Sequence, residues 1–326
     1  MADQRSHDKA NTSPVHVPVM LDDVLRTLAP RAGGVYVDGT FGAGGYTRAI
    51  LDAAPDITVY AIDRDPAAFA RAQKMADEYA GRLKPLFGCF GDAAALLAQA
   101  GVTAVDGMVF DIGVSSIQLE TPERGFSFQS DGPLDMRMGL DGESAADVVN
   151  TYDERALADI IFQYGDERAA RRIAKRIVAA RAETPITRTL QLADIVHSVV
   201  PMHKGLRTDT ATRTFQALRI FVNDELGELD RALQSAEHLI KPDGRLVVVS
   251  FHSLEDACVK RFLRDRSGYN RGVSRHLPDA ADMAKPTFTL EVSGGVAPSD
   301  EETARNPRAR SARLRYGIRT SEVTHA

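Results

Sequence analysis

The apolar positions of the first 115 residues form short runs that are separated by stretches with helical periodicity. These runs cover residues 35–38, 58–62, 83–87 and 107–112. Such alternation is typical of parallel strands that are covered by helices on both faces of a sheet. The pattern therefore predicts four strand–helix units in this part of the chain.

A fifth strand is predicted at residues 245–251, RLVVVSF, after one long helix that ends at the Lys-Pro-Asp-Gly stop signal starting at Lys241. The helix carries apolar residues at positions 215, 218, 222, 226, 229, 233, 236 and 240. Further along, residues 287–292 and 312–318 alternate between apolar and polar side chains. These two segments are predicted to pair as a hairpin at the sheet edge.

About 100 residues separate the fourth strand from the long helix, where only a few residues usually follow a strand. The sequence therefore predicts an inserted helical segment that closes over the carboxyl edge of the sheet, where open α/β folds bind ligands. The predicted division of the chain is a disordered start at 1–14, a sheet domain at 15–116 and 210–326, and an inserted substrate-recognition domain at 117–209.

Helix boundaries within the insertion are marked by polar residues. Ser144 and Asp147 resemble a capping box, and Asp153 is placed to cap a helix over residues 154–164. Asp166 is predicted to cap the next helix, which runs to about residue 182. One more helix is predicted at about 189–200.

The most informative local feature is a glycine-rich loop within VYVDGTFGAGGYT, residues 35–47. It follows the first strand and precedes a helix. Glycine permits a positive φ and close approach of the backbone, and a helix N-terminus presents free N–H groups. The loop therefore predicts a pocket for a nucleotide-like ligand.

The spacing of the glycines bears on which ligand this is. The dinucleotide pattern G-x-G-x-x-G begins at Gly42 and Gly44 but meets Thr47 at the third position, which disfavours an NAD-dependent dehydrogenase. Asp63, at the end of the second strand, suits the ribose of either NAD or S-adenosylmethionine. Phe90 and Asp111 follow the next two strands, where a methyltransferase encloses the adenine and approaches the methionine amino group.

Longer motifs carry a resemblance to a known family. They are DGTFGAGGYT, DIGVSSIQLE, RGFSF, PLDMRM, TRTFQALRIFVNDEL, GRLVVVSFHSLED and NPRARSARLR. In this order they closely resemble the bacterial 16S rRNA (cytosine-N4) methyltransferases called RsmH or MraW, from about residue 16 to residue 319. The resemblance implies a class I S-adenosylmethionine-dependent methyltransferase fold, a Rossmann-like doubly wound sheet. It also implies methylation of the exocyclic N4 of one cytosine in the decoding centre of the small ribosomal subunit.

The same resemblance implies the cofactor-binding residues. They are Gly44, Gly45, Tyr46, Asp63, Phe90, Asp111 and Gln118. Tyr46 stands where the family usually has histidine, so only a backbone contact is carried over at that position. Ile117 and Glu120 replace a proline and an aspartate that the family often has.

The chemistry of the reaction suggests further candidates. Cytosine N4 is a poor nucleophile, so the enzyme must align it with the methyl group and offer acceptors to the amino hydrogens. The loop after the fourth strand supplies Asp111, Ser115 and Ser116 as candidate catalytic residues, with Asp111 preferred as a partner of the cofactor's amino group. Whether any side chain acts as a general base stays open.

Contacts with RNA are predicted at two further places. Ser250 and His252, at the end of the fifth strand, are assigned to the target-base pocket, since the G-x-S-x-G elbow of a Ser/His/Asp hydrolase is absent. Arginines are expected to hold phosphates while the base is turned out of its neighbours. The candidates are Arg137, Arg308, Arg310 and Arg313.

Composition limits the class of protein. The chain has 326 residues, 44% of them hydrophobic, and a formal net charge of −5, which argues against indiscriminate binding to nucleic acid. A polar start and the lack of a long apolar stretch predict a cytoplasmic protein without a membrane anchor. Cys89 and Cys258 are expected to be buried thiols. No convincing metal-ligand set is seen, and His197 and His203 are interpreted as surface residues.

Basic residues nevertheless cluster in two places. One cluster follows a single helical pattern and comprises Arg168, Arg171, Arg172, Lys175, Arg176 and Arg181. The other lies in the C-terminal run and comprises Arg305, Arg308, Arg310, Arg313, Arg315 and Arg319. For each, the alternatives are phosphate contacts and an ordinary solvated surface.

A rival of a different class is a ribosome-assembly protein that keeps the fold but has no catalytic activity. Loss of the glycines, Asp63 or Asp111 would favour it, and all of these residues are present. The sequence leaves the oligomeric state open.

Overall fold

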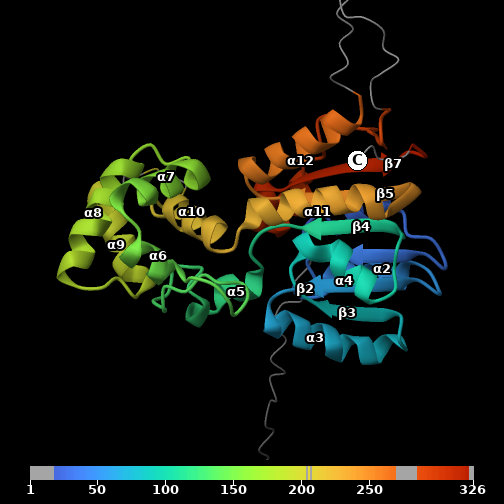
Figure 1. Ribbon diagram of the computed structural model, residues 1–326, viewed down its shortest axis with the longest axis horizontal. Helices are drawn as coiled ribbons and strands as arrows, with labels where there is room; N and C mark the ends of the chain where they lie inside the picture. Colours follow the sequence, from blue (N-terminus) through green and yellow to red (C-terminus); the bar gives the residue numbers. More distant parts are fainter. Residues whose placement is uncertain (1–17, 203–204, 206–207, 269–284, 323–326) are drawn as a thin grey trace, which may run out of the picture.

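The computed structural model describes residues 18–202, 205, 208–268 and 285–322. The predicted disordered start and His203 lie outside these residues. The described chain consists of one sheet with helices packed around it and a separate group of helices (Figure 1). Within it, no helix is long and apolar enough to cross a membrane.

The sheet has seven strands in the order β3-β2-β1-β4-β5-β7-β6. The strands are β1 (Val35–Asp38), β2 (Thr58–Asp63), β3 (Leu83–Phe87), β4 (Val105–Asp111), β5 (Ile240–Ser250), β6 (Phe288–Thr289) and β7 (Arg313–Arg319). The first five strands pair in parallel, while β7 is antiparallel to both β5 and β6. This doubly wound order confirms the predicted class I methyltransferase fold. The predicted pairing at the sheet edge is confirmed over Phe288–Thr289, but residues 290–312 separate the two strands, so they do not form a hairpin.

Helices cover both faces of the sheet, because successive residues of a strand point to opposite sides. On one face, Tyr36 and Val109 pack with α1 (Leu21–Leu28), α2 (Gly45–Ala53) and α3 (Pro66–Ala76). On the other face, Val37 and Phe110 pack with α4 (Ala93–Gln99), α11 (Glu225–Leu239) and α12 (Ser253–Arg266). The remaining short elements around the sheet are η1 (Asp77–Tyr79), η2 (Phe90–Asp92), α13 (Asp300–Arg305) and η5 (Pro307–Ser311).

The segment between β4 and α11 has its own hydrophobic core, which contains Phe126, Ile161, Ile173, Leu192 and Phe215. Its elements are α5 (Ser116–Glu120), η3 (Pro122–Arg124), α6 (Ala145–Thr151), α7 (Glu154–Gly165), α8 (Ala170–Glu183), α9 (Thr189–Val199) and α10 (Thr212–Val222). The helices α6 to α9 lie to one side of the sheet (Figure 1). The expected inserted helices are thus present, and the boundaries 117–209 stay a prediction.

Two predicted caps in this segment are confirmed. Ser144 and Asp147 form a capping box, and the Asp153 side chain accepts a hydrogen bond from Ala156 N. The predicted Asp166 cap is wrong, because α8 begins only at Ala170. Asp166 instead adopts a left-handed conformation, with φ of 48°, at the end of α7.

The single long helix predicted before β5 is also wrong, because the chain breaks into α10 and α11. Asn223 lies at the break, and its amide donates to Met136 O at 2.7 Å and accepts from Met138 N at 2.7 Å. Asp224 has φ of 48°. The tertiary hydrogen bonds of Asn223 fix a turn that the apolar periodicity could not reveal.

Candidate active site

A cavity of about 340 Å³ opens at the carboxyl ends of the parallel strands. The loop after β1 supplies one wall. Gly42 and Gly44 have φ of 54° and 82°, which favours glycine at both positions, and a Cβ at Gly44 would also lie 2.6 Å from Cζ of the Phe41 ring. The loop therefore needs its glycines both for backbone conformation and for packing.

The predicted cofactor residues gather around this cavity with one exception. Gly45, Tyr46, Asp63, Phe90, Asp111 and Gln118 line it. Gly44 does not, since it packs against Phe41 and Met75. The Tyr46 side chain is buried, and its hydroxyl donates a hydrogen bond to Val19 O, so it is engaged inside the protein.

Asp63 fixes the glycine loop to the end of β2. Its Oδ2 accepts a hydrogen bond from Gly42 N at 2.8 Å, and its Oδ1 accepts one from Asp65 N at 2.8 Å. Burial raises the pKa of this carboxyl above its usual value, and the two backbone hydrogen bonds counteract that shift. Asp63 thus combines a structural role with a place on the cavity wall.

Gln118 and Asp65 are joined by a hydrogen bond beside the cavity. Gln118 Oε1 accepts from Ser115 N at 2.9 Å, while its Nε2 donates to Asp65 Oδ2 at 2.8 Å. Arg124 forms an ion pair with the same oxygen of Asp65 at 2.6 Å. Through these contacts, the turn after β2 is tied to the beginning of the inserted segment.

Asp111 occupies the end of β4, beside the candidate residues Ser115 and Ser116, which also line the cavity. Within the described residues, Asp111 Oδ1 is buried and has no hydrogen-bond partner. Burial, followed by the charges of Asp38 and Glu255, raises its pKa well above the usual value. An unpaired buried carboxyl oxygen is costly, so this atom is suited to bind a ligand that brings a donor or a positive charge.

Asp38 lies behind Asp111 and is fully buried. Its carboxylate accepts hydrogen bonds from Thr40 N at 3.1 Å and from Thr47 Oγ1 at 2.7 Å. Burial raises its pKa to about 6. The folded state therefore binds the proton of the Asp38 carboxyl more tightly than the unfolded chain does. The resulting stabilisation is complete at low pH and is lost as the pH rises through about 6.

This linkage leads to a prediction for Asp38→Asn. The amide cannot ionise, so the variant is expected to exceed the natural protein in free energy of unfolding by about 3 kcal/mol at pH 8 and by little at pH 4. Urea unfolding at a series of pH values measures the difference. A difference that does not grow with pH would contradict the assigned pKa shift.

Several residues on the cavity wall were missed by the sequence analysis. They are Arg64, Asp65, Arg219, Glu225 and Glu228, among others. Arg219 forms an ion pair with Glu225 at 2.7 Å, and Arg64 forms one with Glu228. The motif TRTFQALRIFVNDEL contains Arg219 and Glu225, but only the turn between α10 and α11 brings them together.

His252 lies next to the cavity without lining it. It caps α12, where its Nδ1 accepts from Glu255 N at 3.4 Å, and its Nε2 lies 2.9 Å from Glu255 Oε1. Nε2 of His252 and Oε1 of Glu255 are not aligned for a hydrogen bond, and within the described residues neither has a hydrogen-bond partner. Ser250 is buried, and its hydroxyl donates to Arg313 O at 3.3 Å.

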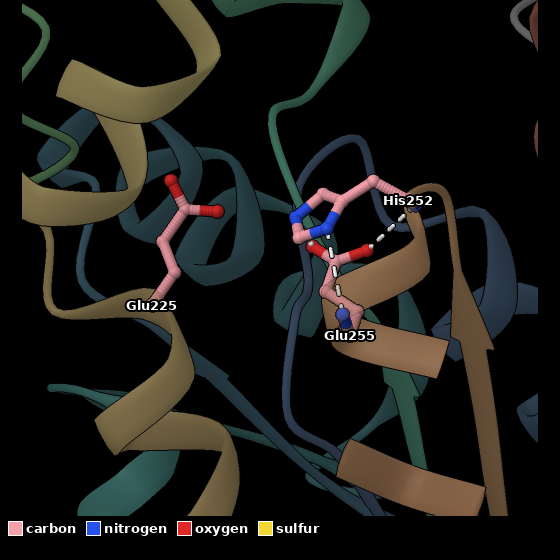
Figure 2. A group of neighbouring side chains, drawn as sticks. All are labelled: Glu225, His252 and Glu255. Carbon is pink, nitrogen blue, oxygen red and sulfur yellow. Dashed lines mark hydrogen bonds and ion pairs between the residues drawn. The ribbon is translucent and has the colours of Figure 1, made fainter. Parts of the chain in front are cut away.

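Glu225, His252 and Glu255 could supply ligands to a cation, because one donor atom from each lies within 4.8 Å of the others (Figure 2). Glu225 projects from α11 toward the start of α12, where the other two residues lie. However, Arg219 donates to both carboxylate oxygens of Glu225, at 2.7 and 2.9 Å. The Arg219 guanidinium therefore already supplies the positive charge that a bound cation would bring to Glu225.

The arginines predicted to hold RNA are placed differently from one another. Arg308 lines the cavity and forms an exposed ion pair with Glu120 at 2.9 Å. Arg310 is exposed and Arg313 is partly exposed, both near the start of β7. Arg137 does not line the cavity, and it is held by two hydrogen bonds to Asp135 at 2.8 Å.

The C-terminal run does not act as a single basic surface. Arg315 is buried and forms an ion pair with Asp256 at 2.6 Å. Arg319 is also buried and donates to the carbonyl oxygens of Glu237 and Thr287. These two arginines hold the edge strand to its neighbours, which leaves Arg305, Arg308 and Arg310 as the exposed cations of the run.

Comparison with known proteins places the chain in a family. The sequence profile of the MraW methylase family matches residues 13–319. The ribosomal RNA small subunit methyltransferase H of Rhodospirillum centenum is 60% identical over 94% of this chain and 93% of its own length. The protein of the same name from Rhodospirillum rubrum is 55% identical over 95% of this chain and 96% of its own length. With its sheet order and its cavity at the strand ends, the chain therefore belongs to the MraW methylase family.

Proposed function

We propose that this protein uses S-adenosylmethionine to methylate the exocyclic N4 of one cytosine in the decoding centre of 16S rRNA, acting on the small ribosomal subunit in the cytoplasm. The names of its relatives support small-subunit rRNA as the substrate. The observation that carries the proposal is the cavity at the ends of β1, β2 and β4, which brings together the glycine loop, Asp63 and Asp111.

The residues on the cavity wall fit this cofactor. Asp63 is placed to accept the ribose hydroxyls, and Phe90 offers an aromatic face for the adenine. The unpartnered Oδ1 of Asp111 fits the positively charged amino group of the methionine part. Bound S-adenosylmethionine would supply an electrophilic methyl group on its sulfonium.

The protein's part in the reaction is to orient the base and to accept its amino hydrogens. The loop from Ile112 to Ser116 lies on the cavity wall beside Asp111 and offers backbone carbonyls and hydroxyls. A hydrogen-bond acceptor on N4–H lets the nitrogen pyramidalise as it approaches the methyl group. We assign Ser115 and Ser116 to this task, although Ser115 also caps α5.

The base must leave its stacked neighbours to enter the cavity. Arg308, on the rim, is placed to hold a phosphate, with Arg310 and Arg313 beside it. His252 and Ser250 are proposed to support the target-base pocket from behind Phe251, which lines the cavity. We propose Arg137 as a further phosphate contact, for which its guanidinium must exchange the Asp135 carboxylate for a phosphate.

Methyl transfer provides the test. Purified protein is incubated with small subunits and radiolabelled S-adenosylmethionine, and the rRNA is digested to nucleosides. We expect the label in N4-methylcytidine. Label in another nucleoside, or none in RNA, would overturn the proposal.

A further inference from the structure

One surface of the inserted segment is not used by the proposed reaction. Along α8 and the turn before it, five basic residues are exposed. They are Arg168, Arg171, Arg172, Lys175 and Arg176, and we call them the α8 basic face. Their spacing of three and four residues places them on one side of the helix, while Ala170, Ile173, Ala174 and Ile177 are buried on the other.

The α8 basic face lacks the counter-charges that a solvated helix normally carries. No Asp or Glu occurs from residue 168 to residue 182. Among the residues that the structure describes, none of the five forms an ion pair. Only Arg172 has a side-chain hydrogen bond, which its guanidinium donates to Val199 O at 3.0 Å. The side chains therefore keep nearly all their donors available to a ligand.

The arrangement does not serve the helix itself. Arg168 and Arg172, Arg171 and Lys175, and Arg172 and Arg176 are like charges four residues apart, which repel each other. Arg171 and Arg172 also lie in the first turn of α8, where the helix dipole disfavours positive charge; the acid nearest to that end is Glu167, which is buried and accepts a hydrogen bond from Ala169 N at 2.8 Å. An electrostatic arrangement that costs helix stability points to an external anionic partner.

Position favours a partner that is large. Figure 1 shows α8 at the outer end of the helical segment, on the side away from the sheet. A single nucleotide in the cavity could not reach this helix. Its helical part, from Arg171 to Arg176, extends about 7.5 Å along the helix axis, and Arg168 continues the face before the helix begins, which allows contact with more than one phosphate of a folded RNA.

We propose that the α8 basic face docks onto the phosphate backbone of 16S rRNA at a place remote from the methylated nucleotide. This inference rests on the proposed function, since it takes small-subunit rRNA as the substrate. Phosphate contacts position a protein without reading sequence. The face would thus orient the enzyme on the subunit, while the cavity selects the base.

The test compares two triple variants that lose the same charge. Arg171→Gln, Lys175→Gln and Arg176→Gln alter the α8 basic face. Arg26→Gln, Lys74→Gln and Lys84→Gln remove exposed cations from the sheet domain. Binding to small subunits is measured with S-adenosylhomocysteine present, over 50 to 200 mM salt, so that methyl transfer is not required.

The first triple variant is expected to bind small subunits roughly tenfold more weakly at physiological salt. Its plot of log affinity against log salt should be less steep than that of the natural protein by about 2, because each lost phosphate contact removes roughly 0.7 to 0.9 from the slope. The second triple variant should match the natural protein, and cofactor affinity should be unchanged in both.

Three outcomes would overturn the proposal. They are an unchanged slope in the first variant, an equal loss in both variants, and a loss on assembled subunits that is absent on protein-free 16S rRNA. The last would assign the α8 basic face to a ribosomal protein. Failure of the proposed function would be seen separately, in the methyl-transfer assay, as the absence of label from N4-methylcytidine.

Discussion

Asp63→Ala is expected to raise the dissociation constant for S-adenosylmethionine roughly 100-fold and to leave the affinity for small subunits unchanged. Two effects combine in this variant. The ribose hydroxyls lose a charged acceptor, and hydrogen bonds to charged groups contribute about 1.5 to 3 kcal/mol each. In addition, Gly42 N and Asp65 N lose the oxygens that hold the glycine loop against β2. Isothermal titration with the cofactor measures the first affinity, and filter binding of subunits measures the second.

Two further variants make this result interpretable. Asp63→Asn keeps one acceptor oxygen and the shape of the side chain, so its affinity for the cofactor should lie between those of the natural protein and the alanine variant. Asp77→Ala removes an exposed carboxylate from η1 and should bind the cofactor normally. Equal losses of cofactor and subunit binding in Asp63→Ala would indicate misfolding and contradict the assigned role.

The sheet could be predicted from the sequence because its strands are short, mostly apolar and bounded by glycine and polar turns. Each of the five parallel strands lies where an apolar run stands. The pairing of β6 with β7 also followed from alternation. These signals are local, and burial on both faces of a parallel sheet leaves little room for another interpretation.

The errors arose where distant residues decide the local conformation. The break between α10 and α11 depends on Asn223, whose partners Met136 and Met138 lie more than 80 residues earlier in the chain. An Asn within an apolar period gives no local sign of such contacts. The burial of Arg315 and Arg319 is of the same kind, since Asp256 and Glu237 reach them from other elements.

The candidate site could be predicted in part for a related reason. Glycines and carboxylates at strand ends are recognisable because parallel strands end at one edge of the sheet. Arg219 and Glu225 could not be recognised, because they belong to helices whose turn was missed. The raised pKa of Asp111 in β4 also depends on Asp38 in β1 and Glu255 in α12, so it requires three elements to be placed together.

The inserted segment and the cofactor cavity are physically connected. Asp65, two residues after Asp63, binds Gln118 and Arg124, and Arg124 Nη2 also donates to the carbonyls of Arg137 and Met138. Contacts made by the cofactor at the end of β2 therefore bear on the residues that lead into the insertion. This connection would couple the cofactor site to the RNA contacts that we propose.

Asp111→Asn is expected to separate the two roles open to this residue. If Asp111 binds the amino group of the cofactor, as we propose, the amide loses the attraction between opposite charges. The dissociation constant for S-adenosylmethionine should then rise roughly 10- to 100-fold, while kcat at saturating cofactor changes much less. Titration calorimetry and steady-state kinetics on small subunits measure the two quantities. An unchanged dissociation constant with a large loss of kcat would assign Asp111 to the amino hydrogens of cytosine instead.

The raised pKa of Asp111 adds a pH dependence to this result. Before the cofactor binds, burial and the neighbouring carboxylates favour the protonated form of Asp111. A cationic amino group favours the carboxylate, so binding releases a proton at any pH at which Asp111 is protonated in the free enzyme, and affinity should increase with pH up to the pKa of Asp111 in the free enzyme. In Asp111→Asn this component of the pH dependence should disappear, because the amide has no proton to release. Affinity that rises equally with pH in both proteins would show that another group, such as Asp38 or Asp63, releases the proton.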